Sequence, residues 1–239
     1  MPMKRLILAI ALCVSLPVWS MAVTPMGQTL EANASTGTMR IHNNNNGQKR
    51  IQIVVDALTV GADGQKIRTP SSDLSFYPAS VITLKPGAVQ TLRWKRNTPP
   101  SAQEKAYQII ITETPMDAED AITDSSGMKV SLSPRMLNPW VFVPAGAKPA
   151  LSAVHEVVQE AGSEVIDGKK RDVLRSVSYL VFRNTGTATA SMVNVSYAGA
   201  VVPGNFLVLP GERLKIKVDR TGKEVSFTSR GVAQSLAVE

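Results

Sequence analysis

The residue types that carry most metal chemistry are sparse in this sequence. It contains two histidines, His42 and His155, and they are more than a hundred positions apart. A zinc site needs several ligands that converge on one ion. His42 has no acidic neighbour, and Glu156 would point to the opposite face of a strand from His155. We therefore expect no metal site.

The residues that could support catalysis are equally poorly placed. The only cysteine, Cys13, lies in an N-terminal apolar stretch, and no Gly-x-Ser-x-Gly elbow occurs. Glu119 and Asp120 form a carboxylate pair, but the polar stretch around them indicates a solvated loop. The run 43–47 (NNNNG) is typical of a turn and has no acidic residue to support calcium binding. The sequence predicts a protein that is not an enzyme and has no catalytic residue or cofactor.

The first 22 residues are typical of a secretory signal peptide. Lys4 and Arg5 precede an apolar run over 6–18, and the small-x-small motif over 20–22 would be followed by cleavage after Ala22. The apolar run is too short to span a membrane, which takes about 20 residues. A buried N-terminal helix is the alternative interpretation. Cleavage would remove Cys13, so we expect an exported chain that forms no intramolecular disulfide.

Charge and hydropathy exclude two further classes of partner. Loss of Lys4 and Arg5 lowers the formal net charge from +7 to +5, and the remaining basic residues are scattered. Nucleic-acid binding favours clustered Lys and Arg with interleaved aromatics, and aromatics make up only 5% of the chain. No later segment is long and apolar enough to cross a membrane, so we expect no membrane insertion after signal cleavage.

The mature chain is dominated by short strand patterns separated by Gly, Pro, Asn and Asp turns. This pattern is typical of an all-β fold of immunoglobulin-like sandwiches. The segment 145–149 (AGAKP) has no large apolar residue and is the best domain boundary. We predict two domains, over 23–145 and 150–239. The expected strands cover 38–42, 48–60, 81–84, 89–94, 106–113, 128–132, 140–144, 151–158, 173–183, 190–197, 206–209, 213–218 and 223–228.

Four segments of the first domain, in order, resemble the PapD-like periplasmic chaperones of the chaperone–usher pathway. They are TMRIHNN over 38–44, YPASVITLKPGAVQTLRW over 77–94, EKAYQIIITETP over 104–115, and PWVFVP over 139–144. In the second domain, FRNTGTA over 182–188 and FLVLPG over 206–211 also fit. The resemblance spans nearly the whole mature chain, and no motif is specific alone.

The resemblance implies two immunoglobulin-like sandwiches in an L-shaped arrangement. It also implies donor-strand complementation, in which the chaperone's last strand of domain one fills the groove of a pilus subunit. Met128, Val130 and Leu132 alternate with polar residues, and such alternation lets one face of a strand fill successive pockets. We therefore expect a donor strand over 128–137. An ordinary edge strand of a sandwich shows the same alternation and is the structural alternative.

The anchor for the subunit's C-terminal carboxylate departs from the usual family pattern. No Arg or Lys occurs between Val23 and Thr38, and Pro139 falls near the expected Lys. Arg135 resembles an arginine found earlier on this strand in other branches, and its planar fork suits a carboxylate. Arg93 is a second candidate; a buried Arg93–Glu113 ion pair on neighbouring strands is its structural alternative.

The expected function is that of a periplasmic chaperone from a divergent, alternative or archaic-like branch. Its partners would be pilus subunits and an outer-membrane usher, and the unpaired donor strand could also mediate self-association. The rival functions are a structural pilus component or adhesin with immunoglobulin-like domains, and a carbohydrate-binding surface module. The second rival requires exposed aromatics, whereas Trp94, Trp140 and Tyr107 fall in apolar strand patterns.

Overall fold

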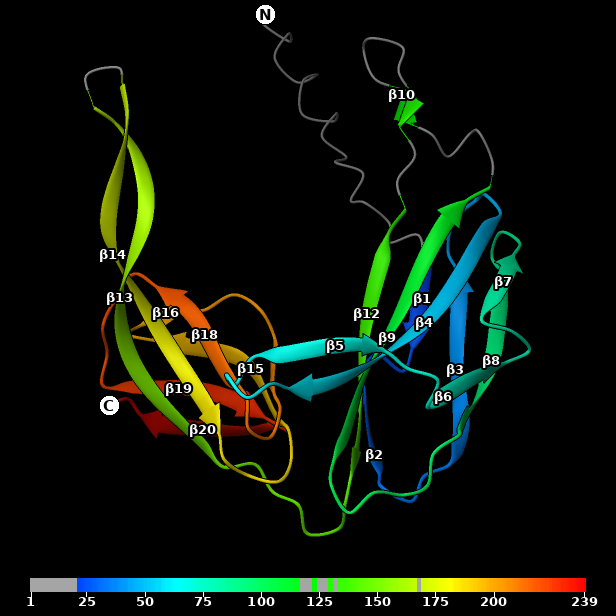
Figure 1. Ribbon diagram of the computed structural model, residues 1–239. Coiled ribbons are helices and arrows are strands. Elements are labelled where there is room, and N and C mark those ends of the chain that lie inside the picture. Colours follow the sequence, from blue (N-terminus) through cyan, green and yellow to red (C-terminus); the bar gives the residue numbers. More distant parts are fainter. Residues whose placement is uncertain (1–20, 117–121, 124–128, 131–132, 167–168) are drawn as a thin grey trace, which may run out of the picture.

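The computed structural model describes residues 21–116, 122–123, 129–130, 133–166 and 169–239. These residues contain strands and no helix, and they form two sandwiches joined through residues 144–150 (Figure 1). The strands of the N-terminal sandwich and its extension are β1 (Met21–Thr24), β2 (Gln28–Glu31), β3 (Thr36–Asn43), β4 (Lys49–Val60), β5 (Lys66–Pro70), β6 (Leu74–Tyr77), β7 (Val81–Leu84), β8 (Val89–Arg96), β9 (Lys105–Pro115), β10 (Ile122–Thr123), β11 (Lys129–Val130) and β12 (Arg135–Val143).

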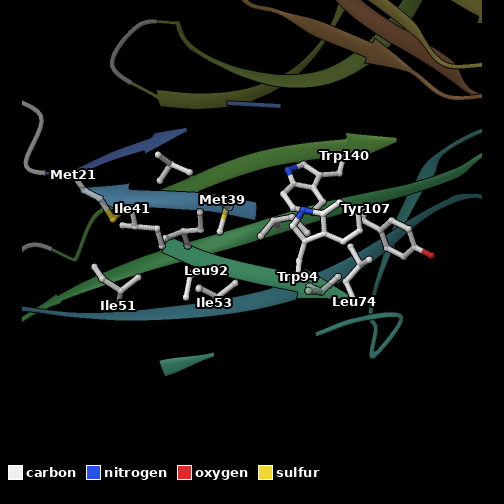
Figure 2. Packing of buried hydrophobic residues seen from close by; sticks show 14 of the residues in the cluster. Met21, Met39, Ile41, Ile51, Ile53, Leu74, Leu92, Trp94, Tyr107 and Trp140 are labelled. Atoms are coloured by element: carbon white, nitrogen blue, oxygen red, sulfur yellow. The ribbon is translucent and has the colours of Figure 1, made fainter. Parts of the chain in front are cut away.

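Two sheets enclose the core of the N-terminal sandwich. One has the order β1-β3-β8-β6, and the other has the order β2-β12-β9-β4-β5, with β7 also paired to β4. Alternate residues of each strand face inward, as in β8, where Leu92 and Trp94 are buried and their neighbours are exposed. Figure 2 shows these side chains packed between the sheets.

Packed aromatic rings form the centre of this core. The rings of Trp94 and Trp140 lie 5.3 Å apart in an edge-to-face arrangement, and Tyr107 packs in the same way on Phe142 at 5.8 Å. Trp94, Trp140 and Tyr107 are each no more than 3% exposed. The expectation that these three aromatics are core residues is confirmed, and they form no exposed sugar-binding platform.

The C-terminal sandwich is built from a three-stranded and a five-stranded sheet. The first has the order β13-β14-β18, and the second has the order β16-β15-β19-β20 with β17 paired to β15. A separate buried cluster that includes Leu180, Phe182 and Tyr197 lies between them. Its strands are β13 (Leu151–Ile166), β14 (Lys169–Asn184), β15 (Ala190–Tyr197), β16 (Ala200–Val201), β17 (Phe206–Val208), β18 (Arg213–Val218), β19 (Glu224–Ser229) and β20 (Val232–Ala237).

A buried asparagine links two turns in each sandwich. The Asn43 side-chain amide donates hydrogen bonds to the carbonyls of Gly47, Leu84 and Lys85, and the Asn43 carbonyl accepts one from Gly87 N–H. Asn184 repeats this arrangement in the second domain. Its amide donates to the carbonyls of Ala188 and Val208, and its carbonyl accepts from Gly211 N–H. The Pro-Gly turns of the two halves therefore have equivalent structural roles.

Replacing Asn184 by Ala should destabilise the protein by about 3 kcal/mol, because two buried carbonyls lose their donors. The exposed Asn205→Ala is the matched control, and its free energy of unfolding should stay within about 0.5 kcal/mol of the parent. Urea unfolding measures both values. Equal stability of the two variants would contradict the structural role given to Asn184.

The two sandwiches contact each other through apolar and polar groups. Leu58, Ala106 and Val141 from the first sandwich pack with Leu209 from the second. The Lys66 ammonium lies 3.2 Å from a carboxylate oxygen of the buried Glu212. These contacts connect the end of β4 and the start of β5 to the Pro-Gly turn of the second sandwich.

Glu104 supplies another contact between the sandwiches, and its carboxyl group is half-buried there. Its carboxylate accepts hydrogen bonds from the Thr189 N–H, at 2.8 Å, and from the Thr189 hydroxyl. Burial raises the pKa of Glu104 above its ordinary value of 4.5, and the Thr189 hydrogen bonds offset part of this rise. A raised folded-state pKa contributes stability below about pH 4.5, and this contribution is lost as the pH rises through the folded-state pKa.

The Glu104→Gln variant should therefore gain stability relative to the parent as the pH is raised from about 4 to about 7. The glutamine keeps an acceptor for the Thr189 N–H and removes the buried charge. Urea midpoints of parent and variant at both pH values measure the difference. A difference that is constant with pH would show that Glu104 does not titrate with folding.

Several predicted strand limits differ from the structure. Gly162, which falls between the strands expected over 151–158 and 173–183, lies inside β13, because the β13–β14 ladder continues through it with unbroken register. The short strands β1, β2, β5, β6 and β20 were not predicted, because their apolar alternation is weak. Met21 and Ala22, assigned to the signal peptide, pair here with Asn43 and His42. The cleavage position stays a prediction.

Candidate functional site

Strand β12 has different neighbours along its two edges. On one edge it pairs with β9 from Arg135 to Phe142. On the other edge β2 pairs only with residues 140–143. Within the described part of the chain, no strand pairs with residues 135–139 on that second edge. This stretch of β12 is an open sheet edge.

Two hydrogen bonds show which backbone groups face the open edge. The Pro134 carbonyl accepts from the Glu113 N–H of β9, and the Val143 carbonyl accepts from the Ala32 N–H on the β2 side. Successive residues of a strand direct their backbone groups to opposite edges, and the β12–β9 register is regular. The N–H and C=O groups of Arg135 and Leu137 therefore face away from β9, where another strand could pair with them.

The side chains of β12 alternate between the core and the surface. Met136 packs against the core, and Asn138 and Trp140 are fully buried. Arg135 is exposed and Leu137 is 42% exposed, so both project from the outer face. The structure thus places Arg135, one of the predicted anchors, at the start of the open edge.

The hairpin that carries the open edge continues beyond the sandwich. Val130 in β11 pairs with Ile122 in β10, which forms a short ladder between β9 and β12 in the chain. Figure 1 shows β10 above the ends of β9 and β12. Met128 and Leu132 lie outside the described residues, as does the Val130 side chain. Their role as pocket-filling residues therefore stays a prediction.

A buried asparagine closes the lower end of the open edge. The Asn138 side chain accepts a hydrogen bond from Gly27 N–H at 2.5 Å and donates one to the Pro25 carbonyl at 3.0 Å. These bonds hold the chain between β1 and β2 against β12. A Cβ atom on Gly27 would lie 3.6 Å from the Pro139 carbonyl oxygen. Gly27 and Pro139 therefore adjoin each other, and neither supplies a cation.

The structure corrects the proposed Arg93–Glu113 pair. Arg93 is exposed on β8, in the sheet that does not contain β9. Glu113 is buried and lies 3.4 Å from the ammonium of Lys49, on neighbouring β4. The prediction of a buried Arg93–Glu113 pair is wrong, because β8 and β9 belong to opposite sheets. Arg93 instead lies between Thr38 and Tyr77 on an outer sheet face, away from the β12 edge.

No group of His, Cys, Asp and Glu residues able to hold a metal occurs in the described ranges. The same residues include no helix long and apolar enough to cross a membrane. The groups that distinguish this site are backbone N–H and C=O groups on an open edge, together with an exposed arginine. Such an arrangement can add a strand from another chain, because main-chain hydrogen bonds supply the contact.

Comparison with known protein families identifies the chain. Residues 21–148 match the model for the N-terminal PapD domain of pili and flagellar-assembly chaperones, which covers more than half of the sequence. The chain belongs to this family. Pilus chaperones of the family are periplasmic assembly factors and not enzymes. No curated protein matches the sequence.

Solved structures of pilus chaperones have the same two-domain fold. A chain of the CsuC–CsuE chaperone–tip adhesion subunit pre-assembly complex, from the archaic chaperone–usher Csu pili of Acinetobacter baumannii, aligns with a TM-score of 0.64 and 16% identity, over 91% of this chain and 97% of that one. A chain of the Salmonella enterica SafA pilin–SafB chaperone complex aligns with a TM-score of 0.58 and 15% identity, over 90% and 91%.

The Pseudomonas aeruginosa CupB2 chaperone aligns with a TM-score of 0.55 and 15% identity, over 91% of this chain and all (100%) of that one. At these identities the likeness concerns the fold. The predicted fold class, two immunoglobulin-like sandwiches in the PapD-like arrangement, is confirmed.

Asn138 and the short strand β2 are the parts of the site that the sequence did not predict. Asn138 lies between Met136 and Trp140 on the inward face of β12, where the other residues are apolar. A polar residue at a core position is the signal that could have identified it, because buried amides need partners. The partners Pro25 and Gly27 are distant in sequence and could not be inferred.

Proposed function

We propose that this chain is a periplasmic chaperone that holds pilus subunits by donor-strand complementation and delivers them to an outer-membrane usher. The observation that carries the proposal is the open edge of β12 over residues 135–139. A subunit that lacks one strand could pair its own edge strand with this edge and take the segment 128–137 into its groove. Family membership supports this proposal, and an N-terminal signal peptide would supply the export.

Capture would need no ATP. The groove of an incomplete subunit exposes apolar surface, and filling it with alternate side chains of a donor strand removes that surface from water. Met128, Val130 and Leu132 are the side chains proposed to enter the groove. The open edge contributes hydrogen bonds through Arg135 and Leu137, which orient the added strand relative to β12.

We propose Arg135 as the residue that binds the subunit's C-terminal carboxylate. Gly27 and Pro139 adjoin each other at the closed lower end of the edge and carry no charge, whereas Arg135 is exposed beside the open part. A guanidinium can donate two parallel hydrogen bonds to a carboxylate. Arg93 is the less favoured anchor, because its sheet lies on the far side of the core from β12.

The Arg135→Glu variant should bind the subunit about 30-fold more weakly, because an attractive charge pair becomes repulsive. Periplasmic co-expression with the subunit encoded beside this chain, followed by titration of the purified partners, measures the change. Arg93→Glu is the matched control and should leave the affinity within about threefold.

A subunit whose C-terminal carboxylate is amidated distinguishes this role from a general charge effect. It should bind the parent weakly and show little further loss with Arg135→Glu. If Arg93→Glu weakens binding and Arg135→Glu does not, the anchor is Arg93. If the subunit neither survives in the periplasm nor co-purifies with the parent chain, the proposed function is wrong.

A further inference from the structure

The hairpin formed by β13 and β14 is longer than the sandwich to which it belongs. Its two strands pair without interruption from Leu151 opposite Asn184 to Ile166 opposite Lys169. Strand β18 pairs with β14 only over residues 178–183. Beyond this point the hairpin continues as a two-stranded ribbon, which we call the ribbon arm (residues 157–166 and 169–177). Val157, opposite Ser178, lies at its base.

The ribbon arm lies outside the hydrophobic core. The core of the C-terminal sandwich includes Ala153 from β13 and Leu180 and Phe182 from β14, but none of the described residues between 154 and 179. In Figure 1 the arm extends well beyond the body of the sandwich. At about 3.3 Å per residue, its nine residues 169–177 span about 30 Å. An element of this length could reach a partner that the sandwich itself does not touch.

Side-chain contacts link the two strands of the arm on both of its faces. The Gln159 side-chain amide donates to the Ser176 hydroxyl at 2.7 Å, and the Tyr179 hydroxyl donates to the Glu160 carboxylate at 2.5 Å. Val177, opposite Val158, is 9% exposed. These contacts give the arm a defined shape. An isolated two-stranded ribbon is nevertheless only marginally stable in water, so a partner would add substantially to its stability.

The face that carries the Gln159–Ser176 hydrogen bond also presents unshielded apolar side chains on either side of it. Leu174, opposite Ala161, is 73% exposed, and Val157 is 58% exposed. Both positions share the face whose continuation, at Ala153 and Phe182, is core. Apolar residues that follow a core face into solvent on a projecting element are typical of a contact surface for another protein.

The direction of the arm indicates which protein it contacts. In Figure 1 the ribbon arm and the β10 end of the N-terminal sandwich project from the same side of the molecule. The open edge of β12 begins at that end. A folded subunit bound at that end would therefore lie on the side of the molecule toward which the arm projects.

We infer that the ribbon arm is a second contact site for the pilus subunit held on β12, made through Val157 and Leu174. This inference rests on the proposed function, because it concerns the partner of the same edge. The arm adds apolar contacts from the second domain to the strand pairing supplied by the first. The strand pairing at β12 and the apolar contact of the arm use different residues, so each can be removed by mutation without changing the other.

Site-specific photo-crosslinking tests the arm's partner directly. A photoreactive residue at Leu174 in the chaperone–subunit complex should form a covalent product with the subunit. The same residue at Val232, which is 61% exposed on β20, is the control and should give none. A product between two copies of this chain from position 174, or equal subunit yields from both positions, would overturn the inference.

Affinity measurements test the arm's contribution. The double variant Val157→Asp/Leu174→Asp should bind the subunit about tenfold or more weakly, because two apolar contacts are lost. Val201→Asp, on β16 and 78% exposed, is the control and should bind like the parent. Unchanged affinity of the double variant overturns the ribbon contact and leaves the proposed function intact. Failure of the parent chain to bind the subunit refutes both.

Discussion

Replacing both Val130 and Leu132 by Asp should abolish subunit binding, with an affinity loss of about 1,000-fold or more. Both side chains are proposed to enter apolar pockets of the subunit's groove, and each carboxylate would have to leave water without a partner. The cost for each charge is several kcal/mol, and every 1.4 kcal/mol is a factor of ten. Co-purification from the periplasm and titration with the isolated subunit measure the loss.

The matched control uses the intervening positions of the same segment. Lys129 and Ser131 alternate with Val130 and Leu132, so in an extended donor strand they face away from the groove. The double variant Lys129→Asp/Ser131→Asp should keep its affinity within about threefold. If both double variants lose binding equally, charge alone explains the effect and the alternating-pocket arrangement is wrong. Urea midpoints of the free variants verify that folding is unchanged.

Replacing Leu137 by Pro should weaken subunit binding about tenfold without unfolding the free protein. The Leu137 N–H faces the open edge, so proline there removes a donor that only an added strand would use. The loss of one intermolecular hydrogen bond corresponds to about 1.4 kcal/mol. Pro139 lies two residues along the same strand, so its backbone nitrogen also faces away from β9. The strand therefore already accommodates a proline at an equivalent position.

Leu137→Ala separates the backbone from the side chain. It shortens the same side chain, which is 42% exposed, but keeps the N–H. Its affinity for the subunit should therefore exceed that of Leu137→Pro severalfold. Equal affinities for the Ala and Pro variants would mean that no strand pairs with this edge, since the N–H would then be dispensable.

The fold was predictable from the sequence where strands carry clear alternation. In β8 the apolar residues Leu92 and Trp94 alternate with exposed polar ones, and the strand appears within two residues of its expected limits. The short β2 has only Leu30 packed against the core, so its pattern was too weak to identify. The length of β13 was missed because Gly162 suggested a turn, whereas pairing with Val173 keeps it extended.

The site was predictable in part. The alternation of Val130 and Leu132 and the position of Arg135 came from local sequence, and Arg135 does lie at the start of an open edge. Which sheet each strand joins depends on contacts between distant residues. For this reason the sequence could not exclude an Arg93–Glu113 pair, and it could not identify the partners of Asn138.

Hydrogen exchange at single backbone amides of β12 tests the central claim most directly. In the free protein the amides of Arg135 and Leu137 should exchange rapidly, because they face the open edge, whereas the Met136 amide faces β9 and should be protected. Adding the subunit should protect Arg135 and Leu137 and leave Met136 unchanged. Rapid exchange at Arg135 and Leu137 in a stable complex would contradict strand addition at this edge.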